Sequence, residues 1–180
     1  MIESIGGIIS LFNGLRNGLQ NSWETLKKGK RKKFIKKLVI LKITLEDIIE
    51  SAEDIFNSIE LIIEKKRTPK NEFEMFMEKI RIQSHNIRIL LSIFQDPILE
   101  NILKTFNPEL RRNIEKYTHI KQSRINFFMY DLYHLKPSDI RKKYNQQYLK
   151  DGYSLLNKLK ETSKAFTPFI NMHASIDDIL

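Results

Sequence analysis

An unbroken heptad pattern that begins at Phe34 is the feature that most constrains the fold. Apolar residues alternate spacings of four and three along this stretch: Phe34, Leu38, Leu41, Leu45, Ile48, Ala52, Ile55, Ile59 and Ile62. This spacing keeps one face of an α-helix apolar, as an a/d seam requires. A second apolar row widens that face, which favours contacts with more than one neighbour: Ile35, Ile49, Phe56 and Ile63. We therefore predict one long central helix over about residues 34–66.

The rest of the chain also favours helices over strands. Lys, Glu, Leu and Ile are abundant, and no stretch alternates apolar and polar residues as a half-buried strand does. Proline follows Thr68, Asp96 and Asn107, which is typical of helix starts, whereas Asp151-Gly152 predicts a stop or a bend. A chain of 180 residues is long enough for one domain with a real core. We therefore predict an all-α fold, a single helical bundle of five to seven helices.

An amphipathic, glycine-rich segment occupies residues 1–30. Its apolar residues recur every three or four positions, as one face of a helix requires: Ile5, Ile8, Ile9, Phe12, Leu15, Leu19 and Trp23. Each glycine lowers helix stability by about 1 kcal/mol relative to Ala, so this helix needs an apolar surface to lie on. That surface is a membrane, an apolar partner or the bundle itself. We divide the chain accordingly, into residues 1–30 and a bundle domain over residues 31–180.

The junction between these two parts is strongly basic. Residues 1–37 hold nine basic and two acidic residues, so they carry most of the net charge of +9. Eight of the basic residues lie close together: Lys27, Lys28, Lys30, Arg31, Lys32, Lys33, Lys36 and Lys37. A helix that begins near Arg31 would place cations at the positive end of its dipole, which costs about 0.3–1 kcal/mol each and can mark a functional site. A helix that runs unbroken from Trp23 would instead make them a solvated face.

The basic run predicts an anionic partner, but charge alone does not specify its chemistry. Each Lys or Arg near an anionic lipid surface contributes about 1 kcal/mol of binding. The same residues would neutralise nucleic-acid phosphates, or meet the acidic surface of another protein. Only Trp23 and Phe34 flank the run, so stacking on single-stranded bases is less favoured than the other two contacts.

A short motif in the second half of the chain carries a catalytic resemblance. Arg112 and His119 are seven residues apart near the start of a predicted helix, which puts both side chains on one face, about 10 Å apart. The eight residues from Arg112 to His119 resemble the Arg-plus-His motif of the all-helical HEPN ribonucleases. That resemblance implies that the two residues bind phosphate and assist cleavage through attack of the RNA 2′-hydroxyl. The alternative is a surface arginine and a half-buried histidine.

Other chemistries lack the residues that they require. The chain has no cysteine, which excludes disulfides, thiolate metal sites and thiol catalysis. His85, His134 and His173 are far apart and have no carboxylate at ligand spacing, so we expect no metal site and no cofactor. The acidic residues between Glu46 and Asp54 lie outside the seam and predict a solvated helix face. No small-molecule substrate is evident.

These features favour a non-catalytic function, although the resemblance leaves an enzyme open. We predict a binding or adaptor component of a larger intracellular assembly that engages an anionic or apolar surface through residues 1–37. The partner would be another protein or the same chain, with a membrane or a nucleic acid as the other anionic surfaces. A membrane-surface effector with an inserting N-terminal helix and a HEPN-like ribonuclease are the alternative functions. The sequence has no uncharged apolar stretch of about 18 residues and no signal-peptide pattern, which predicts a cytoplasmic or peripheral-membrane location.

Overall fold

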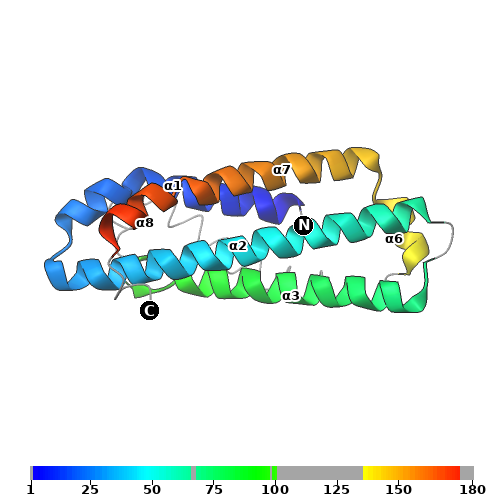
Figure 1. The fold of residues 1–180 in the computed structure, drawn as a ribbon, viewed down its shortest axis with the longest axis horizontal. Coiled ribbons are helices and arrows are strands. Elements are labelled where there is room, and N and C mark those ends of the chain that lie inside the picture. The colour runs from blue at the N-terminus through cyan, green and yellow to red at the C-terminus, as the bar shows by residue number, and fades with distance from the viewer. Residues whose placement is uncertain (1, 66–67, 98, 101–135, 175–180) are drawn as a thin grey trace.

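The computed structural model describes residues 2–65, 68–97, 99–100 and 136–174, and the regular structure among them is entirely helical. The helices are α1 (Ile2–Thr25), α2 (Lys28–Glu64), α3 (Lys70–Phe94), α6 (Pro137–Lys143), α7 (Gln146–Lys164) and α8 (Thr167–His173). Figure 1 shows the long helices side by side along one axis of the molecule. The prediction of an all-α helical bundle is therefore confirmed for the described part of the chain.

The long helix α2 is the centre of this bundle, as the heptad pattern predicts. Every residue of the seam is buried, with an exposed fraction of 3% or less. The second apolar row extends the buried face through Ile35, Ile49 and Phe56. Because this face is wide, α2 packs against α3 on one side and α7 on the other (Figure 1). The helix begins at Lys28, earlier than the predicted start near residue 34.

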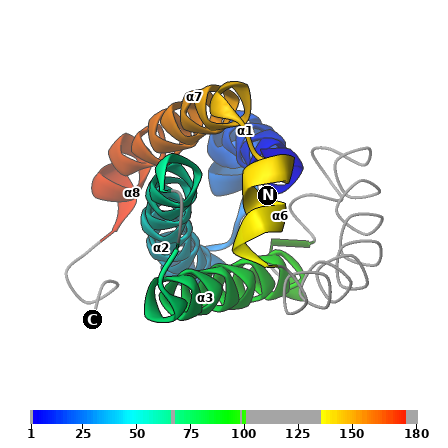
Figure 2. The same ribbon diagram turned by 90° about the vertical axis from the view of Figure 1, so that its right-hand side faces the viewer.

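The shorter helices close the two ends of the bundle. α6 lies against α2 near the end where α2 turns toward α3, and α8 lies beside the opposite end of α2 (Figures 1 and 2). The N-terminal helix α1 packs along α7 (Figure 2). We predicted only that this helix would dock on the bundle or detach from it, and the structure shows it docked.

Phe12 of α1 lies at the centre of the contact that docks α1. Its ring meets the ring of Phe94 edge-on at a centroid distance of 5.5 Å, and the ring of Phe166 edge-on at 5.2 Å. Edge-to-face pairs of this kind contribute about 0.5–1.5 kcal/mol each beyond the apolar area that they bury. The core is therefore continuous from α1 to the other helices. The division into residues 1–30 and 31–180 as separate functional parts stays a prediction.

Gly152 lies inside α7, so the predicted stop or bend at Asp151-Gly152 is wrong. The ring of Phe56 on α2 occupies the space beside Gly152, and a Cβ at this position would overlap that ring. Glycine costs a helix about 0.5–1 kcal/mol relative to alanine, but here it lets α2 and α7 approach closely. The close contact with Phe56 explains why a glycine occupies this position, and a turn does not.

Candidate anion-binding surface

A short break at Leu26 and Lys27 separates α1 from α2. The Leu26 N–H donates to the Ser22 carbonyl over 3.1 Å and completes the last turn of α1. Lys27 then has an extended backbone, with φ −60° and ψ 147°, and α2 begins at the next residue. Of the two alternatives left by the sequence, the unbroken helix from Trp23 is therefore wrong. The lysines lie at a helix N-terminus, and that helix begins before Arg31.

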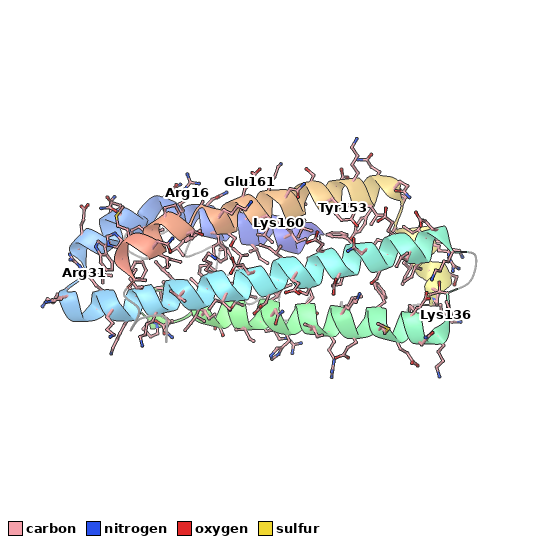
Figure 3. All side chains as sticks on the ribbon, viewed as in Figure 1. Arg16, Arg31, Lys136, Tyr153, Lys160 and Glu161 are labelled. Carbon is pink, nitrogen blue, oxygen red and sulfur yellow. The ribbon has the colours of Figure 1, made fainter. Side chains whose placement is uncertain are left out.

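The basic residues of this junction gather at one tip of the bundle, which we call the basic end: Lys27, Lys28, Lys30, Arg31, Lys32, Lys33, Lys36 and Lys37. Figure 3 labels Arg31 at this tip, where α1 passes into α2. All of these side chains are exposed except those of Arg31 and Lys37, which are half-buried. The basic end therefore contains two held cations and a larger set that faces solvent.

Arg31 holds the junction together. Its Nε donates to the Leu26 carbonyl over 2.9 Å, and its Nη2 donates to the Glu24 carbonyl over 3.2 Å. Its guanidinium carbon also lies 5.2 Å from the centre of the Trp23 ring, within the range of a cation–π contact. A cation is favoured at this place because the last carbonyls of α1 form the negative end of its dipole. Arg31 therefore has a structural role in the basic end.

The exposed lysines contrast with Arg31 because little negative charge faces them. Lys37 pairs with Asp96 at the end of α3, with 2.9 Å between Nζ and Oδ2. In the described ranges no acidic side chain forms an ion pair with five of the other lysines of the basic end: Lys27, Lys28, Lys30, Lys33 and Lys36. As far as the described ranges go, these five charges are available to an external anion.

The start of α2 adds backbone donors to this charge. The N–H groups of Lys30 and Arg31 both donate to the Lys27 carbonyl, over 2.8 and 3.2 Å. Lys27 makes no side-chain cap, and the first turn of α2 has no acidic residue. A helix leaves its first N–H groups without intrahelical partners, and those of Lys28 and Gly29 have none in the described part of the chain. Nothing lies within 4 Å of the side-chain position of Gly29, so an anion can reach these donors.

The predicted apolar contact residues of α1 do not form an open surface in this structure. Ile5, Ile8, Phe12, Leu15 and Leu19 are at most 4% exposed. Ile9 and Trp23 are half-buried and pack against the same core. The ordinary role of a bundle helix therefore describes α1 here, and a partner or membrane could contact this face only if α1 detached.

Trp23 connects the basic end to α8. Its ring lies 4.2 Å from the ring of His173 and 6.1 Å from that of Phe169, measured between centroids. Trp23 also contacts the guanidinium of Arg31. The tryptophan is therefore part of a stack that fixes the tip of α1, and it is not displayed as a membrane anchor.

The remaining predicted site residues are dispersed or lie outside the described residues. Arg112 and His119 lie outside them, as does His134. His85 is exposed on α3, and His173 belongs to the Trp23 stack. Among the residues that the structure describes, no group of three histidines or carboxylates could hold a metal ion.

The acidic residues of α2 have closer neighbours than the sequence indicated. Asp47, Glu50 and Asp54 line a shallow depression of about 330 Å³ between α2 and α3, with Lys79 and Ile82 on the facing wall. The sequence did not predict this depression, because heptad spacing identifies the solvent face of a helix but not the neighbour beside it.

A polar cluster that the sequence did not indicate links α2 to α7. The Tyr153 hydroxyl donates to Asn57 Oδ1 over 2.8 Å and lies 3.3 Å from Glu60 Oε2, while Lys160 Nζ is 2.8 Å from Glu53 Oε2. Burial, followed by the nearby Glu60 carboxylate, raises the pKa of Tyr153. Figure 3 shows Tyr153 and Lys160 on α7 beside α2. The cluster links two helices through side-chain contacts, so we assign it a structural role.

No protein-family model, curated protein or solved structure matches this chain. None of the helices in the described ranges is both long and apolar enough to cross a membrane.

Proposed function

We propose that this chain is a non-catalytic binding protein, an adaptor in a larger assembly, whose basic end engages an anionic partner surface. One observation carries the proposal: five exposed lysines without an acidic partner in the described chain surround an open helix N-terminus. These groups offer charge and hydrogen-bond donors. Binding is therefore the function that this surface supports best.

The arrangement is costly to the free protein and favourable to a complex. Cations in the first turn of a helix destabilise it by about 0.3–1 kcal/mol each, and like charges four residues apart, such as Lys32 and Lys36, add to this cost. A bound anion reverses the sign of both effects, because it faces the helix dipole and the lysines together. The conflict between local stability and charge at the start of α2 therefore supports a binding role.

The proposal rests on the basic end and does not require exposure of α1. Insertion of α1 into lipid is the alternative that Gly6 favours, because nothing within 4 Å explains the absence of a side chain there. A helix with such a glycine is easier to unfold or detach. Hydrogen exchange in α7, on which α1 packs, distinguishes the two cases: amides of α7 keep their protection on anionic vesicles if α1 remains docked. Loss of core contacts around α1 on vesicles would favour insertion.

The experiment that tests the proposal is flotation of the purified protein with anionic vesicles at low salt, with and without excess RNA. Binding to the vesicles, to the RNA or to both is expected, and the competition shows which anion is preferred. Each contact should weaken as salt rises, because exposed charges are screened over about 8–10 Å at physiological ionic strength. Binding to neither anion at low salt would restrict the proposal to an acidic protein partner, sought by crosslinking at Lys28.

The ribonuclease alternative has its own test. RNA cleavage that is lost in Arg112→Ala and in His119→Ala would establish it, and cleavage that persists in both variants would dismiss it. Binding of RNA without cleavage agrees with the proposed adaptor function.

A further inference from the structure

One exposed stripe of α2 carries an unusual order of residues, and we call it the outer face of α2. It comprises Lys33, Lys36, Ile40, Ile43, Asp47, Glu50 and Asp54, at alternating spacings of three and four. All of these residues are exposed, and the stripe lies opposite the buried seam. In Figure 1 this helix crosses the molecule between α7 and α3. The outer face is therefore exposed along its length, and its acidic part borders the depression between α2 and α3.

The two isoleucines at the centre of this face are unusual for solvent. Ile40 is 44% exposed and Ile43 is 53% exposed. Ile89 on the adjacent helix α3 is 37% exposed, and the contact between Ser51 and Gln83 sets a register that places it near the level of Ile43. Exposed aliphatic side chains that cluster beside charged residues are typical of an interaction surface.

The charges on either side of these isoleucines are opposite in sign and similar in spacing. Lysines lie toward the start of α2, and carboxylates lie toward its middle. Reversal of the helix about Ile43 brings Lys36 to the level of Glu50, and brings Lys33 to within one residue of the level of Asp54. The outer face is therefore complementary in charge to an antiparallel copy of itself, whereas a parallel copy would set like charges against each other.

We propose that the outer face of α2 binds the same face of a second copy of this chain, antiparallel, around a two-fold axis beside Ile43. Such an axis makes an isologous contact, in which Lys36 of each copy meets Glu50 of the other. Ile43 would then meet its own equivalent at the centre. This inference goes beyond the proposed function, because it concerns association of the chain with itself.

The charged residues of this contact are free to change partners. Within the described residues neither Lys36 nor Glu50 forms an ion pair. Asp54 lies 3.9 Å from Lys79 Nζ, which is long for a hydrogen-bonded pair. The contact spans about 30 Å of helix, which places it among small, reversible interfaces. The expected dimer is therefore concentration-dependent and sensitive to salt.

A single cysteine tests the position of the axis, because the natural chain has none. Facing Cα atoms of two packed helices approach to about 5–6 Å, which a disulfide can span. Under mild oxidation Ile43→Cys should form a covalent dimer at least about tenfold faster than Asn157→Cys, an exposed position on α7. Equal rates for the two variants would overturn the proposal.

A charge exchange tests the pairing itself, measured by sedimentation velocity at concentrations up to roughly 0.5 mM, as a small interface requires. Lys36→Glu and Glu50→Lys should each weaken association by roughly tenfold or more, because each sets two like-charged pairs across the axis. The double variant restores opposite charges and should return to within about threefold of the natural chain. Lys158→Glu on α7 is the matched control and should have little effect.

A natural chain that stays monomeric over this range, or a double variant that stays as weak as the single variants, would overturn the proposal. The outcome is separable from that of the proposed function. Lys33 and Lys36 belong to both surfaces, so the Lys36→Glu result is interpreted together with Glu50→Lys and Ile43→Cys, which lie outside the basic end. Anion binding is tested at Lys28 and Lys30, which lie outside the outer face.

Discussion

The two ends of α2 use similar residues in opposite ways. At the basic end Arg31 donates to the last carbonyls of α1, and at the other end Arg141 of α6 donates to the Ile62 carbonyl over 2.9 Å and to Thr68 Oγ1 over 2.8 Å. We call this second end the closed end. There Lys65 pairs with Glu72 at 2.8 Å. Both ends are fixed by an arginine. Among the described helix starts at these two ends, that of α2 has several exposed lysines and no acidic residue in its first turn.

The charges of the closed end stabilise the fold, whereas most of those at the basic end are exposed to solvent. At the closed end the first turns of α6 and α3 each contain an acidic residue, Asp139 and Glu72. The Lys136 N–H donates to Asp139 Oδ2 over 2.9 Å at the start of α6. The first turn of α2 has neither feature. A basic composition is therefore not sufficient to identify a binding surface. The distribution of partners around the charges is more informative.

The largest expected effect is on anion binding. Reversal of two charges at the basic end, Lys28→Glu with Lys30→Glu, should weaken binding to anionic vesicles or RNA by roughly 100-fold at low salt, because each lysine near an anionic surface contributes about 1 kcal/mol. The same reversal in α6, Lys142→Glu with Lys143→Glu, is the matched control. Similar losses for the two pairs, measured by vesicle or RNA titration, would mean that the ends are equivalent.

Removal of the two arginines should affect stability unequally. Arg141→Met loses two charge-assisted hydrogen bonds and should lower the free energy of unfolding by about 2 kcal/mol. Arg31→Met also loses its carbonyl contacts, but it relieves repulsion among the neighbouring lysines, so about 1 kcal/mol is expected. Urea unfolding of both variants measures the difference. A larger loss for Arg31→Met would contradict this interpretation of the basic end.

A side-chain cap at the start of α2 should stabilise the fold and weaken anion binding. Lys27 has an extended backbone suited to an N-cap, so Lys27→Asp should stabilise the fold by about 1 kcal/mol. The same variant should bind anions less tightly. Lys136→Asp makes the equivalent change at the N-cap of α6 and should leave anion binding unchanged. Thermal unfolding and vesicle titration of both variants test the pair, and tighter binding by Lys27→Asp would oppose the proposal.

The smallest expected effect is a pH dependence at the closed end. Burial raises the pKa of Tyr144 above its ordinary value of 10.0. The folded state therefore favours the neutral phenol, and this contribution is fully present below pH 10.0 and is lost as pH rises through the higher folded-state pKa. Tyr144→Phe should therefore reduce the loss of unfolding free energy at alkaline pH. Urea unfolding from neutral pH to values above the folded-state pKa of Tyr144 measures this loss. An unchanged slope would assign the loss to other groups.

The sequence predicted the central helix because its buried residues recur with the period of an α-helix. A seam that repeats by threes and fours identifies the buried face of α2 without knowledge of its neighbours. It could not identify which helix would cover that face. The docking of α1 includes contacts of Phe12 with Phe94 at the end of α3 and with Phe166 before α8, and residue spacing does not reveal such contacts.

The break before α2 and the continuity of α7 show two ways in which local sequence signals fail to predict where a helix ends. Lys27 has none of the usual capping chemistry, so the start of α2 could not be located from local signals. Gly152 carries a strong local signal, but the Phe56 ring from another helix explains it. The basic run was recognisable from composition alone. The contacts that hold Lys37 and Arg31 became visible only with the positions of Asp96, Glu24 and Leu26.

The stack at the tip of α1 gives the molecule a built-in optical reporter. Trp23 is the only tryptophan of the chain, and it contacts both the guanidinium of Arg31 and the ring of His173. Indole emission depends on neighbouring charge and on access of solvent, so ligand capture at the basic end, or departure of α1, would alter the fluorescence of the unlabelled protein. Events confined to the closed end would leave the Trp23 emission unchanged. A single spectrum can thus distinguish which end of the bundle has responded.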